Sequence, residues 1–262
     1  MDFTIKIYLK FIRKLLKKNY KFQTICDFLQ RPEEKVILFK HDIDDLKQNS
    51  IIFAKIQRKY DIKGTYYFRI IPRSYDKDIM SEISSFGHEV GYHYENISYI
   101  GKLNKGVSRD QLFELAIADF RENLEKFRKV VPVKTICMHG SPLSKYDNRE
   151  LWDVYNYRDY GIIGEPYIDI DYNDVLYLTD TGRAWNTSIG NVRDKVQSKY
   201  DYSFKSTFDI IRALENDELP DKVMLNIHPQ RWNNSFLPWV KELVWQNTKN
   251  VIKSGLLRHH LQ

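Results

Sequence analysis

The chain has 262 residues, of which 42% are hydrophobic and 14% aromatic, and its formal net charge at pH 7 is +6. This length suits a single α/β barrel, and the composition supplies a sizeable core. No run approaches the roughly 20 apolar residues of a membrane-spanning helix, and lysines interrupt the apolar stretches near the amino terminus, unlike a secretory signal. The sequence therefore predicts a cytoplasmic protein whose two cysteines, Cys26 and Cys137, stay reduced.

The first element predicted along the chain is an amphipathic helix. Basic residues recur on one face at helical spacing and aliphatic residues on the other: Lys6, Lys10, Arg13 and Lys17, against Ile5, Leu9, Ile12 and Leu16. Such a helix either packs on its own domain with a solvated basic face or touches an anionic membrane surface or nucleic acid. Because no nucleic-acid motif accompanies it, we expect no nucleic-acid partner and only a weak membrane contact.

Apolar or β-rich runs alternate with helical segments along the rest of the chain. Strands are predicted at residues 35–40, 65–70, 89–92, 134–138, 161–164, 175–178 and 222–227. Helices are predicted at residues 50–60, 76–86, 109–129, 148–156 and 204–216. This alternation predicts a parallel sheet, and about seven strands in one domain favour a barrel, complete or incomplete, over an open sheet. We expect one domain over residues 1–262, with a helical extension at residues 1–30 and the barrel core at about residues 35–230.

Polar side chains gather at the carboxyl ends of the predicted strands. In chain order they are His41, Asp42 and Asp44, then Arg69, His93, Glu95, His139, Asp180 and His228. In a parallel barrel these ends share one face, where such folds assemble active sites. The loop after the sixth strand adds Arg183 and Trp185, and Trp185 is either a core residue or a wall on which a sugar stacks. The pattern predicts one site.

Asp42 and Asp44 carry the clearest chemical signal. Residues i and i+2 of an extended chain point the same way, so both carboxylates can flank one centre. One can then bind a divalent ion while the other acts as a general base. The structural alternative is a helix N-cap, a role that suits Asp45 better.

The segment "GHEVGYH" contains two histidines five residues apart in a predicted strand. It is therefore not the helical H-E-x-x-H motif of zinc proteases, which needs the two histidines on one helix face. His88 begins the strand, and we expect a structural role for it. His93 leaves the strand at the site, with Glu95 on the same side.

These residues, in this order, resemble the polysaccharide deacetylase superfamily (carbohydrate esterase family 4, NodB-homology type) over about residues 36–228. "KHDID" is similar to a D-x-D variant of the family's first motif, and "HEVGYHYENI" to its second. Asp180 to Trp185 is similar to the fourth motif, and "LNIH", which ends at His228, to the last. The second motif departs from the family at Ile97, where a second histidine is expected.

The resemblance implies an irregular (β/α)7 barrel that hydrolyses an N-acetyl or related group on a sugar with a divalent metal ion, zinc. It implies Asp42 as general base and His228 as general acid. Asp44 and His93 would be metal ligands, with Glu95 or His139 completing the set in place of Ile97. The residues assigned to substrate binding are His41, Arg69, Asp180, Arg183 and Trp185.

Two other functions remain open from the sequence. The chain could be a related barrel that has lost its metal and binds carbohydrate without turning it over, as the loss at Ile97 suggests. It could also be a membrane-surface interaction protein that uses its basic first helix. If it is an enzyme, a sugar conjugate in surface-polysaccharide biosynthesis is the expected substrate.

Overall fold

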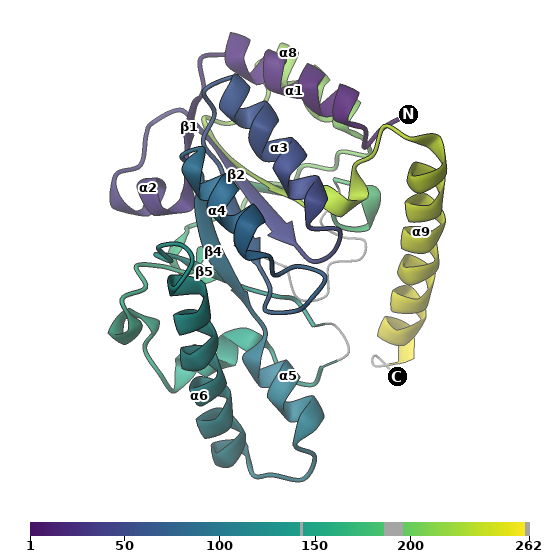
Figure 1. Cartoon of the computed structure of the whole chain (residues 1–262). Helices are drawn as coiled ribbons and strands as arrows, with labels where there is room; N and C mark the ends of the chain where they lie inside the picture. The colour runs from purple at the N-terminus through teal and green to yellow at the C-terminus, as the bar shows by residue number, and fades with distance from the viewer. Residues whose placement is uncertain (142–143, 186–195, 260–262) are drawn as a thin grey trace.

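The chain folds into a parallel sheet wrapped by helices (Figure 1). The computed structural model describes residues 1–141, 144–185 and 196–259, with side chains of the last helix up to residue 248. The strands are β1 (Lys21–Gln23), β2 (Val36–Ile43), β3 (Thr65–Phe68), β4 (Glu89–Tyr94), β5 (Ile136–Met138), β6 (Leu176–Thr179) and β7 (Lys222–Ile227). The helices are α1 (Ile5–Lys17), α2 (Ile25–Gln30), α3 (Gln48–Lys59), α4 (Lys77–Ser85), α5 (Asn96–Leu103), α6 (Arg109–Arg128), α7 (Pro166–Asp169), α8 (Thr207–Glu215) and α9 (Phe236–His259). Short 3-10 turns are η1 (Asn148–Asp153), η2 (Tyr157–Tyr160), η3 (Thr181–Arg183) and η4 (Pro229–Arg231).

All strand pairs are parallel, in the order β5-β4-β3-β2-β7-β6, with β1 paired to the first half of β2. The prediction of an α/β fold with a parallel sheet is therefore confirmed. The sheet curls as a half-barrel, but β5 and β6 remain its two edges, so within the described residues the barrel does not close. Gly91 in β4 leaves room for the ring of Tyr67 on β3, because a Cβ there would lie 2.4 Å from that ring.

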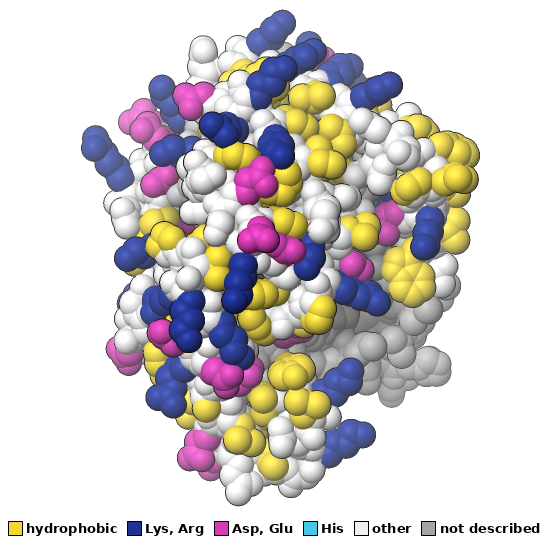
Figure 2. Space-filling model, viewed as in Figure 1, with side chains coloured by type: hydrophobic (Ala, Val, Ile, Leu, Met, Phe, Trp, Pro, Cys, Tyr) yellow, Lys and Arg dark blue, Asp and Glu magenta, His cyan; other side chains and the backbone are white. Residues whose placement is uncertain are grey.

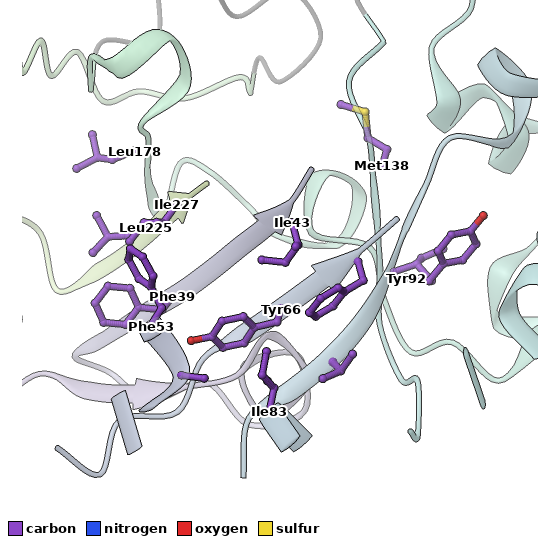
Figure 3. Packing of buried hydrophobic residues seen from close by; sticks show 14 of the residues in the cluster. Phe39, Ile43, Phe53, Tyr66, Ile83, Tyr92, Met138, Leu178, Leu225 and Ile227 are labelled. Atoms are coloured by element: carbon purple, nitrogen blue, oxygen red, sulfur yellow. The ribbon is translucent and has the colours of Figure 1, made fainter. Parts of the chain in front are cut away.

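Strand alternation divides the buried side chains into two clusters. On the outer face, Phe39 and Ile43 of β2 and Tyr66 of β3 belong to the larger cluster, which also includes residues of the helices. Figure 3 shows Phe39 and Tyr66 over the strands near Phe53 of α3. On the inner face of the curl lies a smaller cluster: Val36, Leu38, Tyr67, Cys137, Tyr177 and Met224, with neighbours from α2 and the loop before β6. Alternate residues of each strand therefore point into the half-barrel, which decides which strand-end side chains can reach a common site.

Most predicted elements are confirmed, with instructive exceptions. Strand β2 runs on to Ile43, so His41 and Asp42 lie within the strand rather than after it. The strand predicted at residues 161–164 is wrong: Gly161 caps the end of η2, and only Gly164 bridges to the sheet, at Thr135. The elements that were not predicted include the three-residue strand β1, the helix α5 directly after β4, and the helix α9. No helix among the described residues is long and apolar enough to cross a membrane.

Helix α1 packs into the outer core. Its buried residues are Tyr8, Phe11, Ile12 and Leu15, a stripe offset from the aliphatic face that the sequence predicted. Lys14 pairs with Glu215, and Lys18, directly after the helix, lies 2.7 Å from Asp217. Tyr8, Phe11, Ile12 and Leu15 are thus covered by the protein itself, whereas Leu16 and most basic residues of α1 are exposed.

We predict that Leu15→Ala lowers the free energy of unfolding by roughly 2–5 kcal/mol, because it opens a cavity in a fully buried position. Leu16→Ala is the matched control, since Leu16 is 37% exposed, and its cost should be well under half as large. Urea denaturation measures both. Equal losses for the two variants would mean that α1 does not pack as described.

Candidate metal centre

The inner face of β2 changes from apolar to charged towards its carboxyl end. Lys40 follows Leu38 on this face and has no exposed surface. Its Nζ donates to Asp42 Oδ1 at 2.8 Å and to Oδ2 at 2.7 Å, and Asn226 Nδ2 of β7 donates to the same Oδ2 at 3.0 Å. Both oxygens of Asp42 are therefore held at the bottom of the site.

Asp44 lies one step further out and faces three imidazoles. Its Oδ1 is 3.6 Å from His93 Nε2 and 3.6 Å from His139 Nε2, and its Oδ2 is 3.7 Å from His228 Nε2. These separations are too long for hydrogen bonds. Oδ1 is buried and has no hydrogen-bond partner among the described residues. Of the side chains predicted to meet here, those of Asp44, His93, His139 and His228 do meet.

Each of the three histidines is oriented through its other ring nitrogen. Nδ1 of His93 lies 2.9 Å from the carbonyl oxygen of Cys137, and Nδ1 of His139 lies 3.1 Å from Glu95 Oε2. Nδ1 of His228 lies 2.7 Å from Asp180 Oδ1. Carbonyl and carboxylate oxygens only accept, so Nδ1 carries a proton in each ring. In the neutral rings, Nε2 then presents a lone pair towards Asp44.

Asp180 is the most heavily bonded carboxylate of the site. It is fully buried and accepts from the backbone N–H and Nδ1 of His228, from Arg231 Nη1 at 2.7 Å and from Trp232 Nε1 at 2.7 Å. Burial acts to raise its pKa, but Arg231 and His228 outweigh burial and lower it. Asp180 therefore stays ionised and fixes the ring of His228.

The second carboxylate that supports a histidine is Glu95, directly after β4. Arg69 makes a two-pronged contact with it: Nε donates at 2.9 Å to Oε1, and Nη2 donates at 2.7 Å to Oε2. Burial opposes ionisation, but His139 and Arg69 lower the pKa of Glu95 to about 2. Both oxygens are thus engaged, and the structure places Glu95 behind His139 rather than beside Asp44.

The charges around Asp44 are tightly coupled. Burial acts to raise its pKa, but His139, His228 and His93 lower it well below its usual range. Burial lowers the pKa of His93 to about 4, so this ring is neutral at pH 7. Burial also disfavours charge on His139, but the hydrogen bond to Glu95 and the charge of Asp44 raise its pKa.

The side chains around Asp44 fit a divalent ion. Two ligands at 2.0–2.2 Å from a tetrahedral ion lie about 3.3–3.6 Å apart, close to the three N···O separations observed here. Imidazoles that donate Nδ1–H to a carbonyl or carboxylate while Nε2 stays free are typical zinc ligands. The partnerless oxygen of Asp44 is itself a reason to expect a cation. We therefore place a candidate ion among Asp44, His93 and His139, with His228 at its edge.

A second group, Asp42, His93 and Cys137, brings its donor atoms within 4.8 Å of one another. It fits an ion less well, because both oxygens of Asp42 already bind the Lys40 ammonium. Burial raises the pKa of the Cys137 thiol well above its usual value, whereas a thiol must lose its proton to bind a metal. The ion pair of Asp42 and the protonated thiol of Cys137 therefore favour the group around Asp44 as the ion site.

Several residues predicted for substrate binding lie elsewhere. His41 is buried on the outer face, where its ring stacks on Tyr66 with centroids 4.1 Å apart. Trp185 has no exposed surface and donates to Thr207. Arg183 is 8% exposed and donates to the carbonyls of Arg231 and Trp239. Arg69, by contrast, lines the cavities in front of Asp44 and His139.

Two further sequence expectations concern single residues. His88 has the structural role that was expected: its Nδ1 accepts from Gly64 N–H and its Nε2 lies 3.0 Å from the Ala54 carbonyl. Ile97 is fully buried in the outer core, so α5 turns this position away from Asp44. His139, which directly follows β5, instead brings a second imidazole to Asp44.

Sequence reasoning missed three residues of the site: Lys40, Asn226 and Arg231. Lys40 and Asn226 lie at i−2 from Asp42 and His228, so strand alternation would have placed both on the inner face. Arg231 is three residues after His228, within the turn η4, and no strand pattern indicates it.

A scan against protein-family models found no match to this chain, and a search of curated protein sequences found none either. Among solved structures, the chain is similar to a CE4 family pseudoenzyme from Bacillus anthracis, with 13% identity over 84% of this chain and 63% of that chain, and a TM-score of 0.42. The chain spans less than two thirds of that protein, and a mutant of it is described as having restored enzymatic activity.

Two other solved structures are also similar to this chain. One is the Xyl-CE4 domain of a multidomain xylanase from the hindgut metagenome of Trinervitermes trinervoides, with 14% identity over 82% of this chain and 84% of that chain, TM-score 0.40. The other is a mutant of the peptidoglycan deacetylase PdaC from Bacillus subtilis, with 15% identity over 88% and 99%, TM-score 0.35.

If Glu95 orients His139 and is not itself a ligand, Glu95→Ala should weaken binding of a divalent ion by about 10–100-fold without abolishing it. Isothermal titration with Zn²⁺ measures this. Glu82→Ala is the control, because Glu82 is an acidic residue of α4 that pairs with Lys55 away from the site. An effect as large as that of removing Asp44 would return Glu95 to the ligand set, as the sequence predicted.

Proposed function

We propose that this protein is a metal-dependent hydrolase that removes an acyl group, such as an N-acetyl group, from a sugar or sugar conjugate. The observation that carries this proposal is the buried, partnerless Oδ1 of Asp44 in front of the oriented imidazoles of His93 and His139, with His228 facing the other oxygen. A second carboxylate, Asp42, lies 4.0 Å from both His93 Nε2 and His228 Nε2, so a base and an acid flank the same point.

Asp44, His93 and His139 would hold the ion. A divalent ion in this position would polarise an acyl carbonyl and lower the pKa of a water molecule beside it. His139 takes the part that the family resemblance assigns to the position of Ile97, and Glu95 with Arg69 keeps its ring in the binding orientation.

Asp42 and His228 would divide the proton transfers. As water attacks the acyl carbon, Asp42 accepts the proton that the water loses. As the bond between the carbonyl carbon and the sugar nitrogen breaks, protonated His228 donates its Nε2 proton to the leaving amine. Asp180 stabilises the charged ring through Nδ1, and Arg231 and Trp232 hold Asp180 in place. The products are a free amine on the sugar and a carboxylate.

One observation favours the alternative of a carbohydrate-binding protein without turnover. Burial acts to raise the pKa of Asp42, but Lys40 and then His93 lower it to about 2. A carboxylate with so low a pKa is a weak base at neutral pH. Turnover by a metal-loaded sample therefore separates the two functions.

Asp44→Ala should nearly abolish binding of Zn²⁺, a larger loss than that caused by removing a residue that only orients a ligand. The matched control is Asp45→Ala, because Asp45 is the neighbouring carboxylate and pairs with Arg73 on the surface. Metal titration by calorimetry needs no substrate. If Asp44→Ala binds Zn²⁺ as tightly as the parent, the metal-hydrolase proposal is wrong.

Asp42→Asn should leave metal binding in place but lower turnover by about 10²–10⁴-fold, the usual contribution of a positioned base. Release of acetate from N-acetylated oligosaccharides would report turnover. Because the single variant leaves a buried Lys40 without its carboxylate, the double variant Lys40→Met/Asp42→Asn, which removes both charges, serves as the control for folding. Full activity in either variant would exclude Asp42 as the base.

A further inference from the structure

A large cavity extends from Asp44 along helix α9. It has a volume of about 1300 Å³, and we call it the α9 arm. Its lining includes Leu46, Arg73, Leu237, Lys241 and Trp245. A second cavity of about 910 Å³ continues on the other side of Arg69 and Ile71 towards α5, lined by serines and lysines. The candidate metal centre therefore lies between this second cavity and the α9 arm.

The α9 arm exposes large apolar side chains. Leu237 is 79% exposed, Trp245 57% and Leu46 55%. Leu237, Lys241 and Trp245 follow one another at intervals of four residues, so they form one face of α9. In Figure 2, hydrophobic side chains lie along the edge where Figure 1 shows α9. Leu46 is also held at φ 47°, a conformation that disfavours branched side chains and recurs at ligand sites.

The arm also presents cationic groups that the site does not use. Lys241 is exposed and makes no ion pair with any residue that the structure describes. The side chain of Arg73 is 76% exposed and contacts Asp45 at 3.3 Å. Arg69 and Arg231 also line this cavity but are committed to Glu95 and Asp180. Glu242, the remaining acidic residue of the lining, accepts a hydrogen bond from Gln246.

We propose that the α9 arm binds the non-sugar part of an amphipathic sugar conjugate, namely an anionic linkage of the phosphate type followed by an apolar chain. Lys241 and Arg73 complement the anion, and Leu46, Leu237 and Trp245 cover the chain. This inference rests on the proposed function for the sugar, whose acyl group lies at Asp44. A purely polar glycan would leave these apolar side chains in water.

Binding of dodecyl phosphate below its micelle concentration tests the arm without any substrate turnover. Calorimetry should show that the protein binds this probe at least tenfold more tightly than inorganic phosphate or the neutral dodecyl maltoside. Leu237→Ala/Trp245→Ala should weaken the binding of dodecyl phosphate about tenfold or more, since each truncation removes apolar contact. Arg73→Ala/Lys241→Ala should remove its advantage over dodecyl maltoside.

Three controls make the result decisive. Tyr99→Ala, in the second cavity, and Lys10→Ala/Lys17→Ala, on the basic face of α1, should both leave the affinity for dodecyl phosphate unchanged. Asp44→Ala should lose Zn²⁺ but keep the probe. If Asp44→Ala instead keeps Zn²⁺ while the α9 variants lose the probe, the metal-hydrolase proposal fails and the α9 arm stands.

The inference is overturned if the wild-type protein does not prefer dodecyl phosphate, or if the α1 variant weakens binding as much as the α9 variants do. It is also overturned if anionic phosphatidylglycerol vesicles bind through Leu237 and Trp245 while monomeric dodecyl phosphate does not, because the surface would then be a membrane contact.

Discussion

Asp44 presents a buried carboxylate oxygen with no hydrogen-bond partner among the described residues, and much of the site is arranged around it. An ionised carboxylate in such a position is costly unless a cation neutralises it. Nε2 of His93 and of His139 each lie 3.6 Å from this oxygen, too far to satisfy it, and Nε2 of His228 lies 3.7 Å from the other oxygen. A bound divalent ion would resolve this imbalance, because one cation could contact the oxygen and the imidazole lone pairs at once.

The supports of the imidazoles show that this arrangement is built into the fold. On one side, Arg69 holds Glu95 and Glu95 holds His139; on the other, Arg231 holds Asp180 and Asp180 holds His228. Each chain of contacts joins elements distant in sequence and fixes a ring before any ligand arrives. Such preorganisation is what binding of a metal and catalysis both require.

The sequence predicted the parallel α/β fold and the meeting of Asp44, His93, His139 and His228, because strand ends of a parallel sheet share one side. It did not correctly predict, for every strand-end residue, on which face of the sheet the side chain lies. The alternation that puts Asp42 and Asp44 together also turns His41 to the outer core, where the structure places it. The positions of Trp185, Arg183 and α9 depend on packing between distant loops, which no local pattern reveals. The structure shows a half-barrel that does not close within the described residues, an incomplete form of the irregular barrel that the sequence predicted.

The central claim is that an ion lies among Asp44, His93 and His139. An anomalous difference map from crystals grown with Zn²⁺, recorded at the zinc absorption edge, tests it most directly. The account predicts one strong peak about 2.0–2.2 Å from Asp44 and from the Nε2 atoms of His93 and His139. A peak at Cys137 and Asp42 instead, or no peak in a folded protein, would contradict it.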